Sequence, residues 1–222
     1  MNTWLIDGKT VQAFPGATPG CPLILVNTFA EAVAPLQEAL QEAPDHTLVT
    51  VTGMDWEGDL SPWAAEALNE KSAPFAGGAS AYLHWLESKV LPQVEAQLAV
   101  PPCWRGLAGY SLAGLCAVYA LYNSVGFARV ASMSGSLWFE GFRDYALTTP
   151  LMQVPQCVYF SLGDKEKKTR HPLMRSVQEN TEAIAAHFQH LGVATTFVLE
   201  SGGHFKDAAG RTARGISWLL AQ

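Results

Sequence analysis

The sequence contains little charge and no long apolar run. Lys, Arg, Asp and Glu make up 15% of its 222 residues, and the formal net charge is −6. Such a chain offers no basic surface for nucleic acid or for an anionic membrane, so we expect neither partner. No segment reaches the ~18 apolar residues of a membrane-spanning helix. The first ten residues include Asp7 and Lys9, which argues against a secretory signal.

Cysteine is also scarce, and the four that occur share no metal-ligand spacing. They are Cys21, Cys103, Cys116 and Cys157. Three lie in or beside apolar runs, where a buried free thiol is the expected state. The sequence contains no His-x-x-x-His pair and no cluster of His and Asp. We therefore expect no metal or other cofactor, and a reducing, cytoplasmic location.

Hydrophobic residues are plentiful, at 49%, and they support one domain over residues 1–222. Predicted strands alternate with predicted helices, which is typical of a mostly parallel sheet with helices on both faces. The predicted strands cover residues 22–27, 47–52, 104–108, 128–133, 157–162 and 195–199, after a hairpin over residues 4–11. The predicted helices cover residues 30–41, 79–98 with a break at Pro92, a segment after residue 111, 172–191 and 208–220.

Residues 53–78 form an unusually long connection that is rich in aromatic side chains and helix breakers. Long connections in compact α/β domains are usually functional or partly structured. The segment either covers a site as a lid or packs over an edge of the sheet. His84, in the helix that follows, is expected to be a structural or surface histidine.

A strand-turn-helix pattern surrounds Ser111, in the run Gly109-Tyr110-Ser111-Leu112-Ala113. A serine at such a turn is typical of a nucleophile elbow, which requires small neighbours because its backbone is strained. Gly109 and Ala113, two residues on either side, meet that requirement. The alternative is an ordinary Gly-Ser turn before a buried helix.

Two further strand ends carry the groups that a serine nucleophile needs. His204 follows two glycines after the last predicted strand, and Asp164 and Glu166 lie in the turn after the preceding one. The order serine, acid, histidine is that of an α/β-hydrolase, and the carboxyl ends of parallel strands share one edge. We expect Ser111, His204 and an acid to form a triad. Spacing within the turn favours Glu166, with Asp164 as the alternate acid.

Cationic residues surround that acidic turn, so one carboxylate could instead pair with them at the surface. They are Lys165, Lys167, Lys168, Arg170 and His171. We interpret this run as a solvated face, and the second interpretation is a site for an anionic substrate.

An oxyanion hole would need two backbone N–H groups near Ser111. The first is expected from Leu112, and the second from the loop after the strand at 22–27, at Phe29 or alternatively Thr28. Trp138, which follows another strand, is expected to line the substrate pocket together with Tyr110; the alternative for Trp138 is a plain core residue.

The chain resembles the esterase branch of the α/β-hydrolases, which includes enterochelin and siderophore esterases, feruloyl esterases and esterase D-like enzymes. The resemblance covers about residues 23–220. It is carried by Gly109-Tyr110-Ser111-Leu112-Ala113-Gly114, Ser134-Gly135-Ser136-Leu137-Trp138, Ser161-Leu162-Gly163-Asp164-Lys165-Glu166 and Gly203-His204-Phe205. Ala113 departs from the glycine usual in the branch. The resemblance implies a three-layer α/β-hydrolase fold and supports Glu166, since the acid of the family tends to follow the glycine by three residues.

The expected function is serine ester hydrolysis of a small-molecule carboxylic ester through an acyl-enzyme. One alternative is acyl transfer to an alcohol or amine acceptor by the same residues. Another is a non-catalytic binding protein on the same fold, because a fold alone does not determine function. We expect a monomer or a small homo-oligomer.

Overall fold

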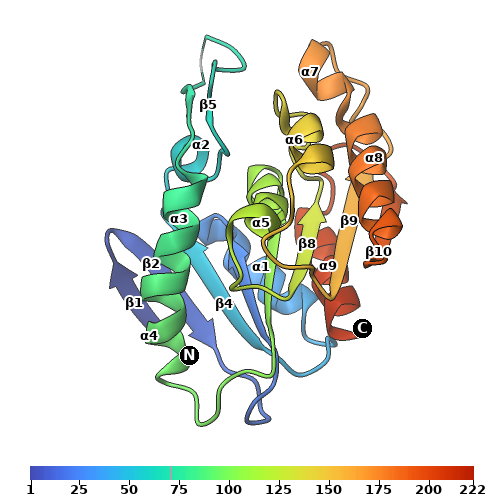
Figure 1. Cartoon of the computed structure of the whole chain (residues 1–222). Helices are drawn as coiled ribbons and strands as arrows, with labels where there is room; N and C mark the ends of the chain where they lie inside the picture. Colours follow the sequence, from blue (N-terminus) through green and yellow to red (C-terminus); the bar gives the residue numbers. More distant parts are fainter. Residues whose placement is uncertain (71) are drawn as a thin grey trace.

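The computed structural model, which describes residues 1–70 and 72–222, has a central sheet covered by helices on both faces (Figure 1). Its eight strands lie in the order β1-β2-β4-β3-β7-β8-β9-β10, and a separate small sheet pairs β5 with β6. The strands are β1 (Asn2–Ile6), β2 (Lys9–Phe14), β3 (Leu23–Asn27), β4 (Thr47–Thr52), β5 (Ala64–Ala65), β6 (Phe75–Ala76), β7 (Arg105–Tyr110), β8 (Arg129–Met133), β9 (Cys157–Gly163) and β10 (Ala194–Glu200). All pairs from β4 to β10 are parallel, while β2 runs antiparallel to β1 and β4, so the predicted mostly parallel sheet is confirmed.

The helices form two outer layers. Helices α1 and α9 pack together on one face of the sheet, and α3, α5 and α8 lie on the other (Figure 1). The helices are α1 (Val33–Ala39), α2 (Trp56–Asp59), α3 (Ala79–Trp85), α4 (Leu91–Glu95), α5 (Leu112–Asn123), α6 (Phe142–Thr148), α7 (Pro172–Arg175), α8 (Val177–His190) and α9 (Ala208–Leu220). The three-layer α/β arrangement expected from the sequence is therefore confirmed.

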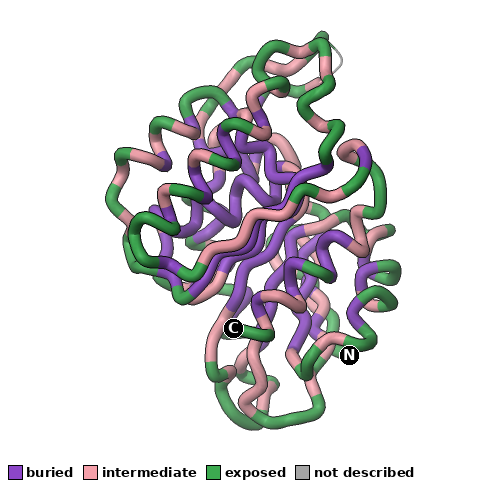
Figure 2. The backbone as a smooth tube through the Cα atoms, turned by 90° about the vertical axis from the view of Figure 1, so that its right-hand side faces the viewer, coloured by how far each residue is buried: buried purple, intermediate pink, exposed green. Residues whose placement is uncertain are grey.

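The central strands are buried on both faces because helices cover both (Figure 2). In β3, Ile24 and Val26 pack into the cluster beneath α1 and α9. Leu23 and Leu25 point the other way, into the larger cluster beneath α3 and α5. This alternation explains why the strand is a continuous apolar run, and it fixes the strand ends that carry the candidate site.

Two predicted helices differ in detail from the structure. The helix over residues 79–98 was expected to break at Pro92, but Pro92 lies in the first turn of α4, where a missing N–H costs little. The irregularity comes one turn earlier, as a π-helical segment over Leu86–Val90. The helix over 172–191 is divided at Ser176 into α7 and α8. His84 is exposed on α3, as a surface histidine.

The cysteines are all free thiols, and two of the three expected to be buried are fully so. Cys116 and Cys157 lie in the core, Cys21 is partly buried and Cys103 is exposed. Burial raises the pKa of the Cys116 thiol to about 12, which keeps it protonated and unreactive.

Within the described part of the chain, no helix has both the length and the apolar character needed to cross a membrane.

Candidate active site

Ser111 lies at a sharp turn between β7 and α5, with a φ of 59° and a ψ of −123°. Residues other than glycine rarely adopt a positive φ, so the serine is strained. The turn is tight: a Cβ at Gly109 would come within 2.3 Å of the Ala113 backbone, which makes glycine necessary there. The Ser111 N–H donates to the Met133 carbonyl at 3.1 Å, and the Ser136 N–H donates to the Ser111 carbonyl at 3.0 Å. Neighbouring strand ends therefore stabilise the strained serine.

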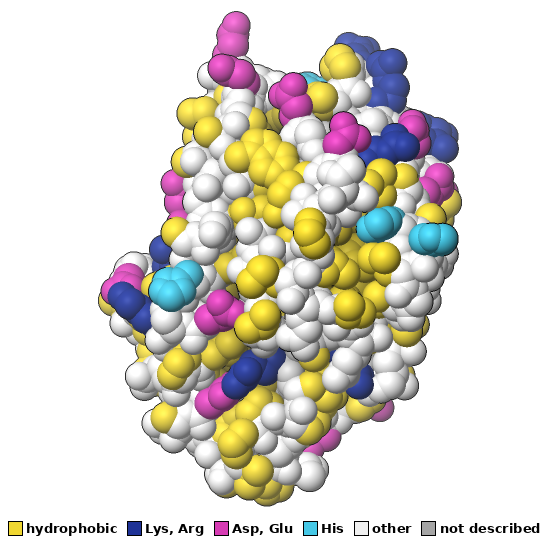
Figure 3. All heavy atoms as spheres, viewed as in Figure 1, with side chains coloured by type: hydrophobic (Ala, Val, Ile, Leu, Met, Phe, Trp, Pro, Cys, Tyr) yellow, Lys and Arg dark blue, Asp and Glu magenta, His cyan; other side chains and the backbone are white. Residues whose placement is uncertain are grey.

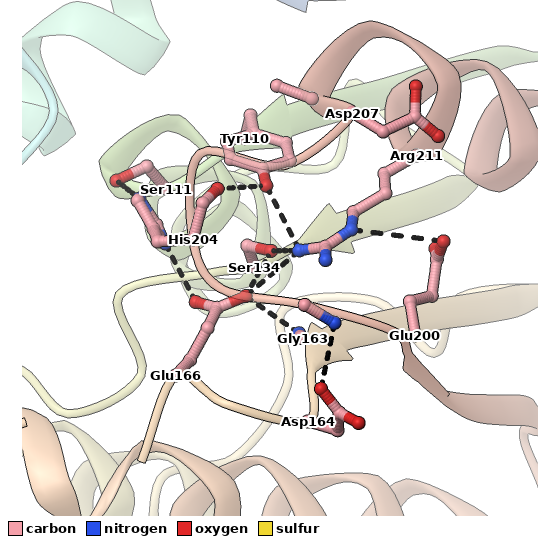
Figure 4. A network of polar contacts seen from close by, with 12 residues as sticks. Tyr110, Ser111, Ser134, Gly163, Asp164, Glu166, Glu200, His204, Asp207 and Arg211 are labelled. Carbon is pink, nitrogen blue, oxygen red and sulfur yellow. Dashed lines mark hydrogen bonds and ion pairs between the residues drawn. The ribbon is translucent and has the colours of Figure 1, made fainter. Parts of the chain in front are cut away.

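The imidazole of His204 lies between Ser111 and Glu166 (Figure 4). Its Nε2 is 3.0 Å from the Ser111 Oγ, and its Nδ1 is 2.7 Å from Oε2 of Glu166. The loop after β10 carries the histidine, and the Tyr110 hydroxyl donates to its backbone carbonyl at 2.5 Å. Three side chains that are distant in sequence thus meet at one edge of the sheet.

Glu166 is the carboxylate that contacts the histidine, and its side chain is only 5% exposed. Burial by itself would raise its pKa, but hydrogen bonds from His204, Ser134 and the Gly163 N–H outweigh burial and hold the pKa below its usual value. The carboxylate is therefore ionised near neutral pH and can only accept hydrogen bonds. It follows that Nδ1 of His204 donates to Glu166, which leaves Nε2 to accept the Ser111 proton.

Asp164, the alternate acid, has a different position. It is exposed, and its Oδ1 accepts a hydrogen bond from the Gly202 N–H at 2.8 Å. This bond fixes the turn just before His204 and does not involve the imidazole. Asp164 therefore supports the loop, whereas Glu166 contacts the ring.

The sequence interpretation missed Arg211, which is 1% exposed and reaches the triad from α9 (Figure 4). Its Nη1 donates to Oε1 of Glu166 at 3.1 Å and to the Oγ of Ser134 at 3.0 Å. Nη1 also lies 3.3 Å from the Tyr110 hydroxyl, and Nη2 of Arg211 donates to the Ser201 carbonyl. The available signal was its spacing: Arg211 shares the buried stripe of α9 with Gly215 and Leu219, where a basic residue needs a partner.

Replacing Arg211 with methionine is expected to lower the free energy of unfolding by about 3 kcal/mol, because it leaves a buried carboxylate without its cation. The matched variant is Arg214→Met on the same helix. Arg214 pairs with Glu200 and Asp207, but it is half exposed and should cost less than about 1 kcal/mol. Urea unfolding followed by circular dichroism measures both, and equal losses would contradict the structural role given to Arg211.

The backbone near Ser111 includes N–H groups that have no acceptor among the described residues, and those of Leu112 and Phe29 are the two expected to form an oxyanion hole. The Leu112 N–H is the first of α5, where amides have no partner within the helix. The N–H of Thr28, the alternate donor, donates to the Val51 carbonyl at 3.0 Å and is therefore already paired. Among the described residues neither Leu112 nor Phe29 has an acceptor for its N–H, which leaves this pair as the candidate oxyanion hole.

A cavity of about 510 Å³ opens beside Ser111 and His204. Trp138 is half-buried and lines it, as does Tyr110, so both expected pocket residues lie at the cavity. The connection over residues 53–78 contains α2, β5 and β6 and contributes Trp56 and Phe75 to the wall. Residues of this segment therefore form part of the cavity wall, and its interpretation as a cover over the site stays a prediction.

These features define an α/β-hydrolase fold with a serine, a histidine and a carboxylate at the carboxyl ends of its strands. A family model described as "Putative esterase" matches residues 27–193. The chain belongs to this family and is a serine ester hydrolase.

Solved structures and one relative are similar over nearly the whole chain. The siderophore hydrolase EstA from Aspergillus nidulans superposes with a TM-score of 0.79 at 17% identity, covering 99% of this chain and 94% of that one. The IroE-like serine hydrolase from Shewanella oneidensis gives a TM-score of 0.77 at 16% identity, with 96% and 76% covered. The Bacillus subtilis protein YbbA, described as uncharacterized, is 24% identical over 218 residues, which are 91% of this chain and 87% of YbbA.

Proposed function

We propose that the protein hydrolyses a small-molecule carboxylic ester with Ser111 as nucleophile, His204 as general base and Glu166 as the acid that orients the ring. The observation that carries the proposal is the continuous hydrogen-bonded chain from the Ser111 Oγ through His204 to Glu166, at 3.0 and 2.7 Å. The strained backbone at Ser111 and the shared edge of the sheet support it. The whole chain acts as one catalytic domain.

The mechanism follows from the hydrogen-bond directions. His204 Nε2 takes the Ser111 proton as the oxygen attacks the ester carbonyl, and Glu166 stabilises the imidazolium that forms. The N–H groups of Leu112 and Phe29 stabilise the negative oxygen of the tetrahedral intermediate. The imidazolium then protonates the departing alcohol, which leaves an acyl group on Ser111. Water, deprotonated by the same histidine, releases the acid.

A common acyl-enzyme can be tested by partitioning. Several aryl esters that share one acyl group but differ in leaving group are hydrolysed in the presence of methanol, and acid and methyl ester are measured. We expect the same product ratio for every leaving group, because water and methanol compete for one intermediate. A ratio that changes with the leaving group would contradict the covalent mechanism, and near-complete transfer to the alcohol would indicate an acyltransferase.

A further inference from the structure

The cavity beside Ser111 has walls with very little charge. Among its described lining residues, Glu57 is the one side chain with a formal charge when His204 is neutral. Glu57 belongs to α2, is partly buried, and has no ion-pair partner among the described residues. Glu57 therefore brings a carboxylate to a wall that is otherwise uncharged and mostly apolar. Such a charge repels a negative group brought into the same space, because water screens it incompletely there.

The side of the cavity towards α3 and α5 is aromatic. Phe29 stacks on Trp56 with ring centroids 4.2 Å apart, and Phe75 meets Trp138 edge to face at 6.4 Å. Aromatic faces of this kind favour apolar or aromatic groups and provide few hydrogen bonds.

The side of the cavity towards α1 and α9 is lined by small and aliphatic side chains. These include Ala32, Leu36, Ala208, Ala209 and Thr212. Leu36 belongs to the apolar cluster between the sheet and these two helices. The ester carbonyl at Ser111 would therefore have apolar space on both sides.

The cationic residues that follow Asp164 do not add positive charge to the lining of the cavity. Lys165, Lys167, Lys168 and Arg170 are all exposed, and none of them lines the cavity. Basic side chains gather at the surface near α7, at the upper right of Figure 3. Exposed charges of this kind are screened by salt, so they attract anions weakly and do not offset desolvation inside the cavity.

We infer that the natural substrate is an ester with uncharged, apolar groups on both sides of its carbonyl, and that Glu57 selects against anionic esters. The inference rests on the proposed function.

The test uses two esters of nearly equal shape, 4-nitrophenyl 6-methylheptanoate and 4-nitrophenyl hydrogen adipate, in which an isopropyl group replaces a carboxylate. We expect kcat/KM for the neutral ester to be at least about 100-fold higher, because the carboxylate must be desolvated in an apolar site. The variant Glu57→Gln should reduce this ratio about tenfold by removing the repelling charge. Glu31→Gln, an exposed carboxylate just before α1, is the matched control and should leave the ratio unchanged.

Several outcomes would overturn the inference. They are equal or faster turnover of the anionic ester, steep loss of its turnover with added salt, and a ratio that Glu57→Gln does not change. Absence of turnover for both esters, together with no labelling by a fluorophosphonate, would instead overturn the proposed function. The two failures are therefore distinguishable.

Discussion

The variant Ser111→Ala is expected to lose about 10⁴- to 10⁶-fold in kcat for neutral aryl esters, the loss typical of removing a triad nucleophile. The reason is that no other group at the turn can form the acyl-enzyme, while the remaining N–H groups and the cavity supply only residual acceleration. Steady-state release of 4-nitrophenol measures the effect. Because alanine keeps the Cβ and the backbone contacts of Ser111 with Met133 and Ser136, the variant should remain folded.

Ser136 provides the matched control for this prediction. Its Oγ lies 3.5 Å from the Ser111 Oγ, so it occupies the same pocket but has no hydrogen bond to the imidazole. Ser136→Ala should lose about tenfold or less, the effect of one neutral hydrogen bond. If Ser136→Ala is as inactive as Ser111→Ala, the assignment of the nucleophile is wrong.

The variant Glu166→Gln is expected to lower kcat about 10³- to 10⁴-fold, because it favours the wrong tautomer of the histidine. Ser134, Gly163 and Arg211 all donate to Oε1 of Glu166, so the glutamine oxygen must occupy that position. Its NH₂ group then faces Nδ1 of His204 and donates to it. The ring proton is thereby placed on Nε2, which can no longer accept the proton of Ser111.

The variant Asp164→Asn tests whether Asp164, the other carboxylate in this turn, contributes to catalysis. Asp164 accepts one hydrogen bond from Gly202 and does not contact the ring, and asparagine retains an acceptor. We expect a loss of about tenfold or less, from a looser loop before His204. Parallel measurement of kcat for both variants decides between the acids, and a larger loss in Asp164→Asn would reverse the assignment.

The sheet and the positions of the three groups could be predicted because both depend on local signals. Buried strands appear as continuous apolar runs, and the carboxyl ends of parallel strands meet at one edge. Glycines and a serine at a strand-helix turn mark the strained position at Ser111 through sterics alone. The order of strands and helices therefore predicted that the three groups would lie near one another, although no contact between them was known.

The remaining features depend on tertiary contacts that the sequence does not specify. Asp164 and Glu166 lie two residues apart, and only the path of the loop determines which one faces His204. The amide of Thr28 is occupied because the carbonyl of Val51, the register partner of Asn27 at the end of β3, accepts its proton. Arg211 lies about a hundred residues from Tyr110, and only the packing of α9 on the sheet brings them together. In each case the tertiary packing determines which residue contacts the site, and the local sequence does not.

The most direct test of the central claim is the site of covalent labelling by a fluorophosphonate, mapped by peptide mass spectrometry on the folded protein. We predict one adduct per chain, located on Ser111, absent from Ser111→Ala and retained in Ser136→Ala. An adduct on another residue, or equal labelling of the Ser111→Ala variant, would contradict the account.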